Sequence, residues 1–145
     1  MKVIVTCIEN YRESLIGQKD YLVIEVYISK RMQKTSFRIS DEQGTLTIFN
    51  YDMFVIKEPS LSGYSIKFRD SSTQITVSKL LELERESSNI NGLWGEYFDG
   101  DVETTKKVHE IIEEFAKKQN VQITEPVSYS CFGPDAFLPL RPNSQ

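Results

Sequence analysis

The chain has 145 residues and a formal net charge of −4, with 39% hydrophobic and 11% aromatic residues. This composition is that of one ordinary globular domain and excludes a disordered chain. The negative charge disfavours a nucleic acid as a direct partner, and the N-terminal apolar run is too short for a signal peptide or a membrane span. We therefore expect a cytoplasmic protein with neither a membrane nor a nucleic acid as its partner.

The first half of the sequence predicts a succession of short β-strands. Apolar runs and alternating patterns, separated by turn residues, predict strands at residues 2–8, 21–29, 35–40, 45–49, 53–56, 64–69 and 74–77. The basic turn KRMQK, residues 30–34, and the polar turn DSST, residues 70–73, are each expected to join the strands beside them as a hairpin. In the second of these, Tyr21, Glu25 and Tyr27 fall on the side opposite the aliphatic residues, so we expect them on an outward face. Gly44 is expected to supply a positive φ in the tight turn before the fourth strand.

After residue 77 the spacing of apolar residues changes to that of helices. Residues 78–86 predict a short helix capped by Ser78, and a break at 89–92 precedes one helical turn at 93–98. The longest helix is predicted from Val102 to Lys118, with Asp101 as its N-cap. Its core-facing stripe is expected to hold Val108, Ile111, Ile112 and Phe115.

These elements predict an α+β fold, in which a bent antiparallel sheet or small barrel is followed by a helical C-terminal third that packs on it. We expect one domain over 1–145. It is mainly β over 1–78 and mainly α over 79–120, and 121–145 hold an edge strand at 121–124 and an extended tail.

The cysteines and the single histidine form no recognisable metal or catalytic motif. Two cysteines, Cys7 and Cys131, are too few for a structural zinc site, and a disulfide is not expected in the cytosol. His109 is expected at the surface or boundary of the long helix. The sequence has no glycine-rich phosphate loop, no GxSxG and no CxxC.

Acids near the start of the long helix imitate the spacing of an EF-hand loop, but Thr104 stands where that loop needs glycine. The same acids fit a helix start, so we expect no calcium site and no other metal. Paired carboxylates could also serve a small hydrolase, yet nothing in the sequence fixes a pair in a pocket. We expect no catalytic residue and no cofactor.

The segment GLWGEYFDGD, residues 92–101, is the most aromatic and acidic stretch of the chain. Trp94, Tyr97 and Phe98 fall on one side of a helical turn, and we expect that side to fill the core between sheet and long helix. The hydroxyl group of Tyr97 needs water or a partner, so Tyr97 is expected to be partly accessible.

Charge is unevenly distributed along the sequence. Residues 82–114 carry −7 and the rest of the chain +3. We expect a solvated acidic face, with Tyr97 as its aromatic anchor, to bind a basic protein partner. The predicted partner-binding residues are Glu82, Glu86, Glu96, Tyr97, Asp99, Asp101 and Glu103.

Two resemblances bear on the function, the first on a scaffold role and the second on the acidic face. The stretches IGQKDYLVIEV and FRISDEQGTLTIFNYDMFVI make the first 57 residues resemble an SH3-like small β-barrel, without the features that bind proline-rich peptides. The whole chain, with LWGEYFDGD and its acidic helix, is similar in type to bacterial immunity proteins of polymorphic or contact-dependent toxin systems. That resemblance implies a non-enzymatic protein that binds one cognate toxin, often a basic nuclease.

The leading hypothesis is therefore a cytoplasmic immunity protein. The alternative is a regulatory or scaffold subunit that holds a partner chain on its outward β face, at Tyr21 or Tyr27. A small hydrolase that uses the carboxylates is the third class.

Overall fold

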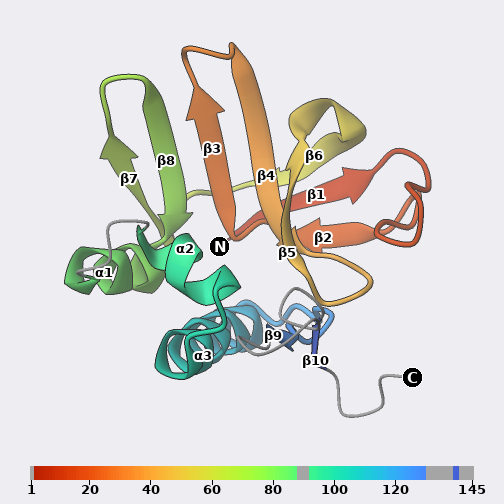
Figure 1. Cartoon of the computed structure of the whole chain (residues 1–145). Coiled ribbons are helices and arrows are strands. Elements are labelled where there is room, and N and C mark those ends of the chain that lie inside the picture. The colour runs from red at the N-terminus through yellow and green to blue at the C-terminus, as the bar shows by residue number, and fades with distance from the viewer. Residues whose placement is uncertain (1, 88–91, 130–138, 141–145) are drawn as a thin grey trace.

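The computed structural model describes residues 2–87, 92–129 and 139–140. Cys131, most of the expected break at 89–92 and most of the expected C-terminal tail lie outside these residues. Two antiparallel sheets are followed along the chain by three α-helices, which confirms the predicted α+β class (Figure 1).

Within the described residues, the strands form a three-stranded sheet of order β2-β1-β6, a five-stranded sheet of order β5-β4-β3-β8-β7, and a short β10-β9 pair. The strands are β1 Val3–Cys7, β2 Asp20–Leu22, β3 Glu25–Ser29, β4 Lys34–Ser40, β5 Leu46–Asn50, β6 Phe54–Pro59, β7 Tyr64–Phe68, β8 Ser72–Val77, β9 Ser128–Tyr129 and β10 Pro139–Leu140.

The expected single strand at 21–29 is wrong, because the chain changes sheets in its middle. β2 ends at Leu22 in the three-stranded sheet, and β3 begins at Glu25 in the five-stranded sheet. Between them, the N–H of Val23 donates to Val3 and that of Ile24 donates to Arg38. Since both sheets cover this crossing, residues 21–26 are all buried and no outward face forms there.

Two predicted hairpins are confirmed. β3 pairs with β4 so that Ser29 lies opposite Lys34 across the predicted basic turn. β7 pairs with β8 so that Phe68 lies opposite Thr73 across the predicted polar turn. These two hairpins make up four of the five strands of the larger sheet.

The turn at Gly44 has the predicted positive φ, of 77°. A Cβ atom at this position would come within 2.4 Å of the carbonyl oxygen of Glu125, so glycine also allows a close approach of the chain. The expected edge strand at 121–124 is wrong. This segment is held by isolated bonds, including Ser40 Oγ to the carbonyl of Thr124 at 2.6 Å and Val127 N–H to that of Gly44 at 3.0 Å.

The helices are α1 Ser78–Glu86, α2 Gly92–Phe98 and α3 Val102–Lys118, with a short 3-10 turn at Tyr51–Met53. Ser78 does not cap α1. The N-cap position is Val77, and Ser78 Oγ instead lies 2.8 Å from Ser65 Oγ on β7. The sequence suggested a cap because serine is a frequent one, whereas here the strand runs into the helix without a break.

α3 has the predicted bounds, and Asp101 caps it by accepting from Thr104 N–H at 2.9 Å. Its buried seam is rotated from the predicted stripe. Val108 and Ile112 are buried, as is Ala116, whereas Ile111 and Phe115 are only partly buried at the seam's edge.

The main core lies between the two sheets and extends under the helices. Phe37, Phe49 and Phe54 form edge-on ring pairs at centroid distances of 5.8 and 6.4 Å. Figure 1 shows the three helices gathered at the end of the large sheet where β8 leads into α1. Among the described residues, no helix is both long and apolar enough to cross a membrane.

Candidate functional site

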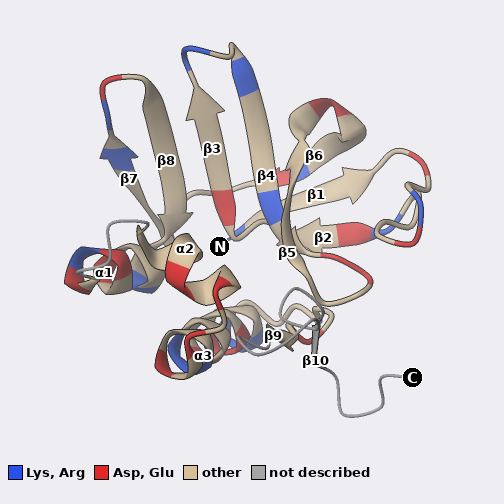
Figure 2. Cartoon of the chain, viewed as in Figure 1, with Lys and Arg blue, Asp and Glu red and all other residues tan. Residues whose placement is uncertain are grey.

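The three helices place the acidic residues of the stretch 82–114 together at one end of the molecule. α1, α2 and α3 contact one another, and Figure 2 shows their acidic ribbon segments around α2. Glu82 and Glu103 are more than 20 positions apart in the sequence, and the packing of the helices brings them to the same end of the molecule.

Glu96 joins the three helices. Its Oε1 accepts from Ser87 Oγ at 2.6 Å, just after α1, and its Oε2 accepts from Thr104 Oγ1 at 2.8 Å in the first turn of α3. The side chain is half-buried. The prediction that Glu96 is a solvated binding residue is therefore corrected, since both of its oxygens are engaged in holding the helices together.

The other five predicted acids are exposed, and we call them the acidic face: Glu82, Glu86, Asp99, Asp101 and Glu103. None of them forms an ion pair with another described residue. Asp101 also caps α3, and its hydrogen bonds from Thr104 hold the pKa of its carboxyl group below the ordinary value. The acidic face thus keeps its negative charge without a basic neighbour bound to it.

Other acids of the same stretch are neutralised within the chain. Glu114 accepts from Lys79 at 3.2 Å and from Lys118 at 2.9 Å. Glu84 lies 3.8 Å from Lys67 and 3.5 Å from Arg69. In this stretch, the exposed acids without an ion pair among the described residues are those of the acidic face and, further along α3, Glu110 and Glu113.

Val102 is an apolar residue at the centre of the α2–α3 junction. It is 77% exposed, and it stands between two members of the acidic face, Asp101 and Glu103. From the sequence, Val102 is recognisable only as the first residue of the predicted helix. Its exposure gives the acidic face one apolar contact point.

Tyr97 is not the accessible anchor that the sequence predicted. Its side chain is 0% exposed, and its ring packs edge-on against Trp94 and Phe98 at 5.6 and 5.0 Å between centroids. Its hydroxyl donates to the carbonyl of Val127 at 3.1 Å and lies 2.7 Å from Nε2 of His109. These partners stand 12 and 30 residues away in the sequence, so the local pattern could not show that the hydroxyl is satisfied.

His109 lies at the boundary of α3, as expected. The Tyr97 hydroxyl is within hydrogen-bond distance of both Nε2 of His109 and the carbonyl of Val127, and the tautomer of His109 decides which side donates in the Tyr97–His109 bond. Burial lowers the pKa of His109 below its ordinary value, while the carboxylate of Glu125 and the carbonyl of Val127 act in the opposite direction. The histidine is thus a hydrogen-bond partner of a buried tyrosine, in surroundings that disfavour its charged form.

A buried charged pair, which was not predicted from the sequence, lies under α2. Glu25 on β3 is opposite Arg38 on β4, both are buried, and Arg38 Nε lies 3.8 Å from Glu25 Oε1. Arg38 also donates from Nη1 to the carbonyl of Leu46 at 2.7 Å. Burial lowers the pKa of Arg38, and the carboxylate of Glu25 opposes that shift.

Aromatic residues of α2 close over this pair. Trp94 Nε1 donates to Glu25 Oε2 at 3.0 Å, and the same oxygen accepts from Gln74 Nε2 at 2.9 Å. The Arg38 guanidinium carbon lies 4.0 Å from the centroid of the Trp94 ring, within the range of a cation–π contact. The pair therefore fixes α2 to the sheet. The predicted turn at residues 30–34 already implies that Glu25 lies opposite Arg38 in the hairpin. The pairing of these two charged residues could therefore have been predicted from the sequence.

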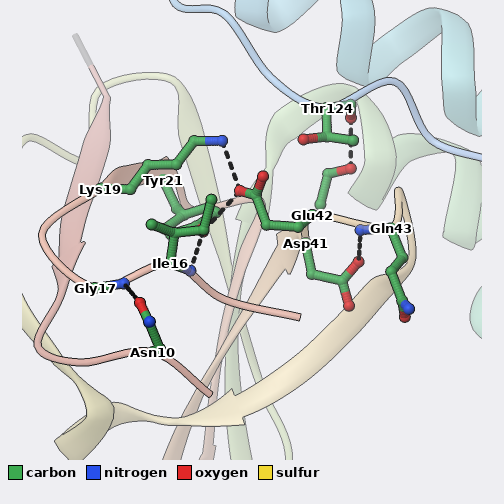
Figure 3. Close-up of polar contacts among 10 residues, drawn as sticks. Asn10, Ile16, Gly17, Lys19, Tyr21, Asp41, Glu42, Gln43 and Thr124 are labelled. Carbon is green, nitrogen blue, oxygen red and sulfur yellow. Dashed lines mark hydrogen bonds and ion pairs between the residues drawn. The ribbon is translucent and has the colours of Figure 1, made fainter. Parts of the chain in front are cut away.

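The outward β face of the alternative hypothesis does not form as predicted. Tyr21 is 5% exposed, and its hydroxyl donates to Glu42 Oε2 at 2.8 Å and accepts from Ile16 N–H at 2.9 Å. Figure 3 shows this contact, together with Lys19 at 2.6 Å from the same carboxylate. Burial raises the pKa of Tyr21. Tyr27, in contrast, is 38% exposed on β3.

Within the described part of the chain, no three His, Cys, Asp or Glu side chains are placed to hold a metal ion together. Cys7 is buried and its thiol donates to the carbonyl of Glu9 at 3.0 Å. Burial raises the pKa of this thiol above its ordinary value. Cys7 is therefore a small buried side chain rather than a reactive one.

Comparison of the chain with protein-family models, with curated proteins and with solved structures finds no match.

Proposed function

We propose that this protein is a non-enzymatic, cytoplasmic binding protein whose acidic face captures a basic protein partner, in the manner of an immunity protein that neutralises a toxin. The observation that supports the proposal best is the acidic face itself. It has five exposed carboxylates without an ion pair among the described residues, on helices that Glu96 holds together.

The proposed mechanism separates the rate of encounter from the lifetime of the complex. The field of the acidic face speeds the association of a basic partner, and this effect weakens as salt screens it. Val102, exposed among the acids, supplies an apolar contact that slows dissociation once the partner has docked. Tyr97 contributes from the interior by fixing α2 against α3.

A toxin domain that acts on nucleic acid fits this face, because such a domain needs a basic surface to bind phosphates. Binding at the acidic face would cover that basic surface directly. The proposal therefore predicts that the partner loses its activity on nucleic acid when the complex forms.

A pull-down from the native cell tests the proposal. Wild-type protein is immobilised beside two charge-reversed variants of equal net charge, Asp99→Lys/Glu103→Lys on the acidic face and Glu9→Lys/Asp52→Lys on exposed positions elsewhere. We expect mass spectrometry to identify a basic protein that binds wild type and the control, and that the acidic-face variant loses. Equal capture by all three, or an acidic partner, would contradict the proposal.

A scaffold role has one observation in its favour. Tyr27 is 38% exposed and Ile48 is 42% exposed, and the register of β3, β4 and β5 places both on the face of the large sheet that holds Glu25. This candidate predicts that Tyr27→Ser/Ile48→Ser abolishes capture while the acidic-face variant retains it. The same pull-down therefore separates the two functions.

A further inference from the structure

Two hairpin tips lie side by side at one end of the large sheet. The β3–β4 connection holds residues 30–33, and the β7–β8 connection holds residues 69–71. β3 and β8 are paired so that Ser29 lies opposite Ser72, and Lys30 N–H donates to the carbonyl of Ser71 at 2.8 Å. The two tips therefore form one continuous surface.

This surface is basic. Lys30, Arg31 and Lys34 are exposed, and none of them forms an ion pair with another described residue. Arg69 is also exposed, although it lies 3.5 Å from Glu84, and Asp70 is the acid at the tips. Figure 2 shows the basic ribbon segments on these connections and on the adjoining ends of β4 and β7.

Two large apolar side chains accompany the basic residues. Met32 is 68% exposed in the first connection, and Phe68 is 77% exposed at the end of β7. Both stand at the ends of hairpins, and most of each side chain is open to solvent. We call Lys30, Arg31, Met32, Lys34, Phe68 and Arg69 the basic tip.

Apart from Arg69, which lies 3.5 Å from Glu84 on α1, the basic tip lies at the end of the large sheet away from the acidic face. The helices are gathered at the end of the sheet where β8 leads into α1, and the tips are at the other end of the same strands (Figures 1 and 2). The net charge of −4 therefore conceals two separate regions of opposite sign. No membrane partner is expected from the sequence, because its N-terminal apolar run is too short to span a bilayer, and the separation of charge changes that expectation.

We propose that the basic tip docks the protein on an anionic lipid surface. Each lysine or arginine near such a surface strengthens binding by a factor of about five, and exposed apolar side chains gain by entering the boundary between headgroups and acyl chains. When the basic tip faces the membrane, the acidic face points away from it. The negative charges of the acidic face are therefore kept away from the negative lipid headgroups.

A lipid surface fits this geometry better than a nucleic acid or an acidic protein. A single strand of nucleic acid would stack its bases on several aromatic rings, and the basic tip has one such ring, Phe68. An acidic protein would need complementary shape around Met32 and Phe68, whereas a bilayer interface yields to side chains that project from a convex end.

Co-sedimentation with lipid vesicles tests the proposal. We expect the full chain to bind vesicles rich in phosphatidylserine and to dissociate from them as the salt concentration is raised. Binding to vesicles of phosphatidylcholine alone should be weaker by about tenfold or more. Lys30→Glu/Arg31→Glu should lower the binding to phosphatidylserine vesicles more than about tenfold. Met32→Ser/Phe68→Ser should lower binding severalfold and leave its salt dependence in place.

The matched control is Lys106→Glu/Lys107→Glu, which makes the same change of net charge on exposed positions of α3. This control should bind phosphatidylserine vesicles like wild type, and all variants should keep the wild-type circular dichroism spectrum because the changed side chains are exposed. Equal binding to both kinds of vesicle, an equal loss in the control, or binding to polyglutamate or single-stranded RNA without binding to vesicles would overturn the proposal.

Discussion

Glu25 and Arg38 show how the surroundings of a residue decide its role. The sequence placed Glu25 on an outward face because charged side chains are seldom buried without partners. In the fold its carboxylate has three, namely Arg38, Gln74 and the indole of Trp94. Each of these comes from a different element, so no window of sequence contains the whole cluster.

Breaking this pair should be costly. Arg38→Met leaves the Glu25 carboxylate buried without its counter-charge, and we expect a loss of about 3–5 kcal/mol of unfolding free energy. Urea melts of wild type, Arg38→Met, Glu25→Leu and the double variant form a cycle. The double variant should recover a large part of the loss, because it leaves no buried charge unpaired. Additive losses would contradict a coupled pair.

His109 should make the stability depend on pH. The pKa of His109 is lowered in the folded state. As the pH falls, the unfolded chain therefore takes up the proton at a higher pH, about 6.5, than the folded chain does. The unfolding free energy should therefore be largest above that pH and should fall as the pH drops through the folded-state pKa. Chemical melts at intervals between about pH 8 and about pH 5.5 should show this fall in wild type but not in His109→Gln. An equal fall in the variant would assign it to other groups.

At the scale of elements, the sequence predicted what is encoded locally. The bounds of α3 follow from Asp101 and the closing lysines, and the two confirmed hairpins follow from their turn residues. The errors occur where elements meet. Residues 21–29 carry one alternating pattern although two sheets share them, and Tyr97 is buried by partners on α3 and at Val127. The exposed acids of the acidic face were predicted because the net charge of a stretch can be read from the sequence without knowing any long-range contact.

The junction of the three helices offers a test at this scale. Glu96→Ala removes the acceptor of two hydroxyl groups, Ser87 and Thr104, and should lower the unfolding free energy by about 1–2 kcal/mol. Glu82→Ala, on the exposed side of α1, should change it by less than about 0.5 kcal/mol. Equal effects in urea melts would show that Glu96 does not join the helices.

The rotated seam of α3 leads to a second test. Ile112 is fully buried, so Ile112→Ala should cost about 2–5 kcal/mol through lost burial and the cavity that remains. Glu110→Ala, on the exposed side of α3, is the control and should stay within about 0.5 kcal/mol. A small effect at Ile112 would mean that another side of α3 faces the core.

At the scale of the whole molecule, the fold turns an uneven distribution of charge along the sequence into two surface regions of opposite sign. The acidic face forms on helices from the second half of the chain, and the basic tip forms where hairpins from residues 30–34 and 68–71 meet. The electrostatic field of such a domain is directional, so a basic partner that approaches it is attracted to the end that carries the helices. The proposed function depends on this long-range field more than on any single contact.

The most direct measurement is the association rate constant with the captured basic partner, followed by surface plasmon resonance over a series of salt concentrations. For wild type and the Glu9→Lys/Asp52→Lys control, we predict fast association that slows steeply with salt. For Asp99→Lys/Glu103→Lys, association should be slower at low salt and nearly independent of it. If that variant associates like wild type at both low and high salt, the acidic face is not the binding surface.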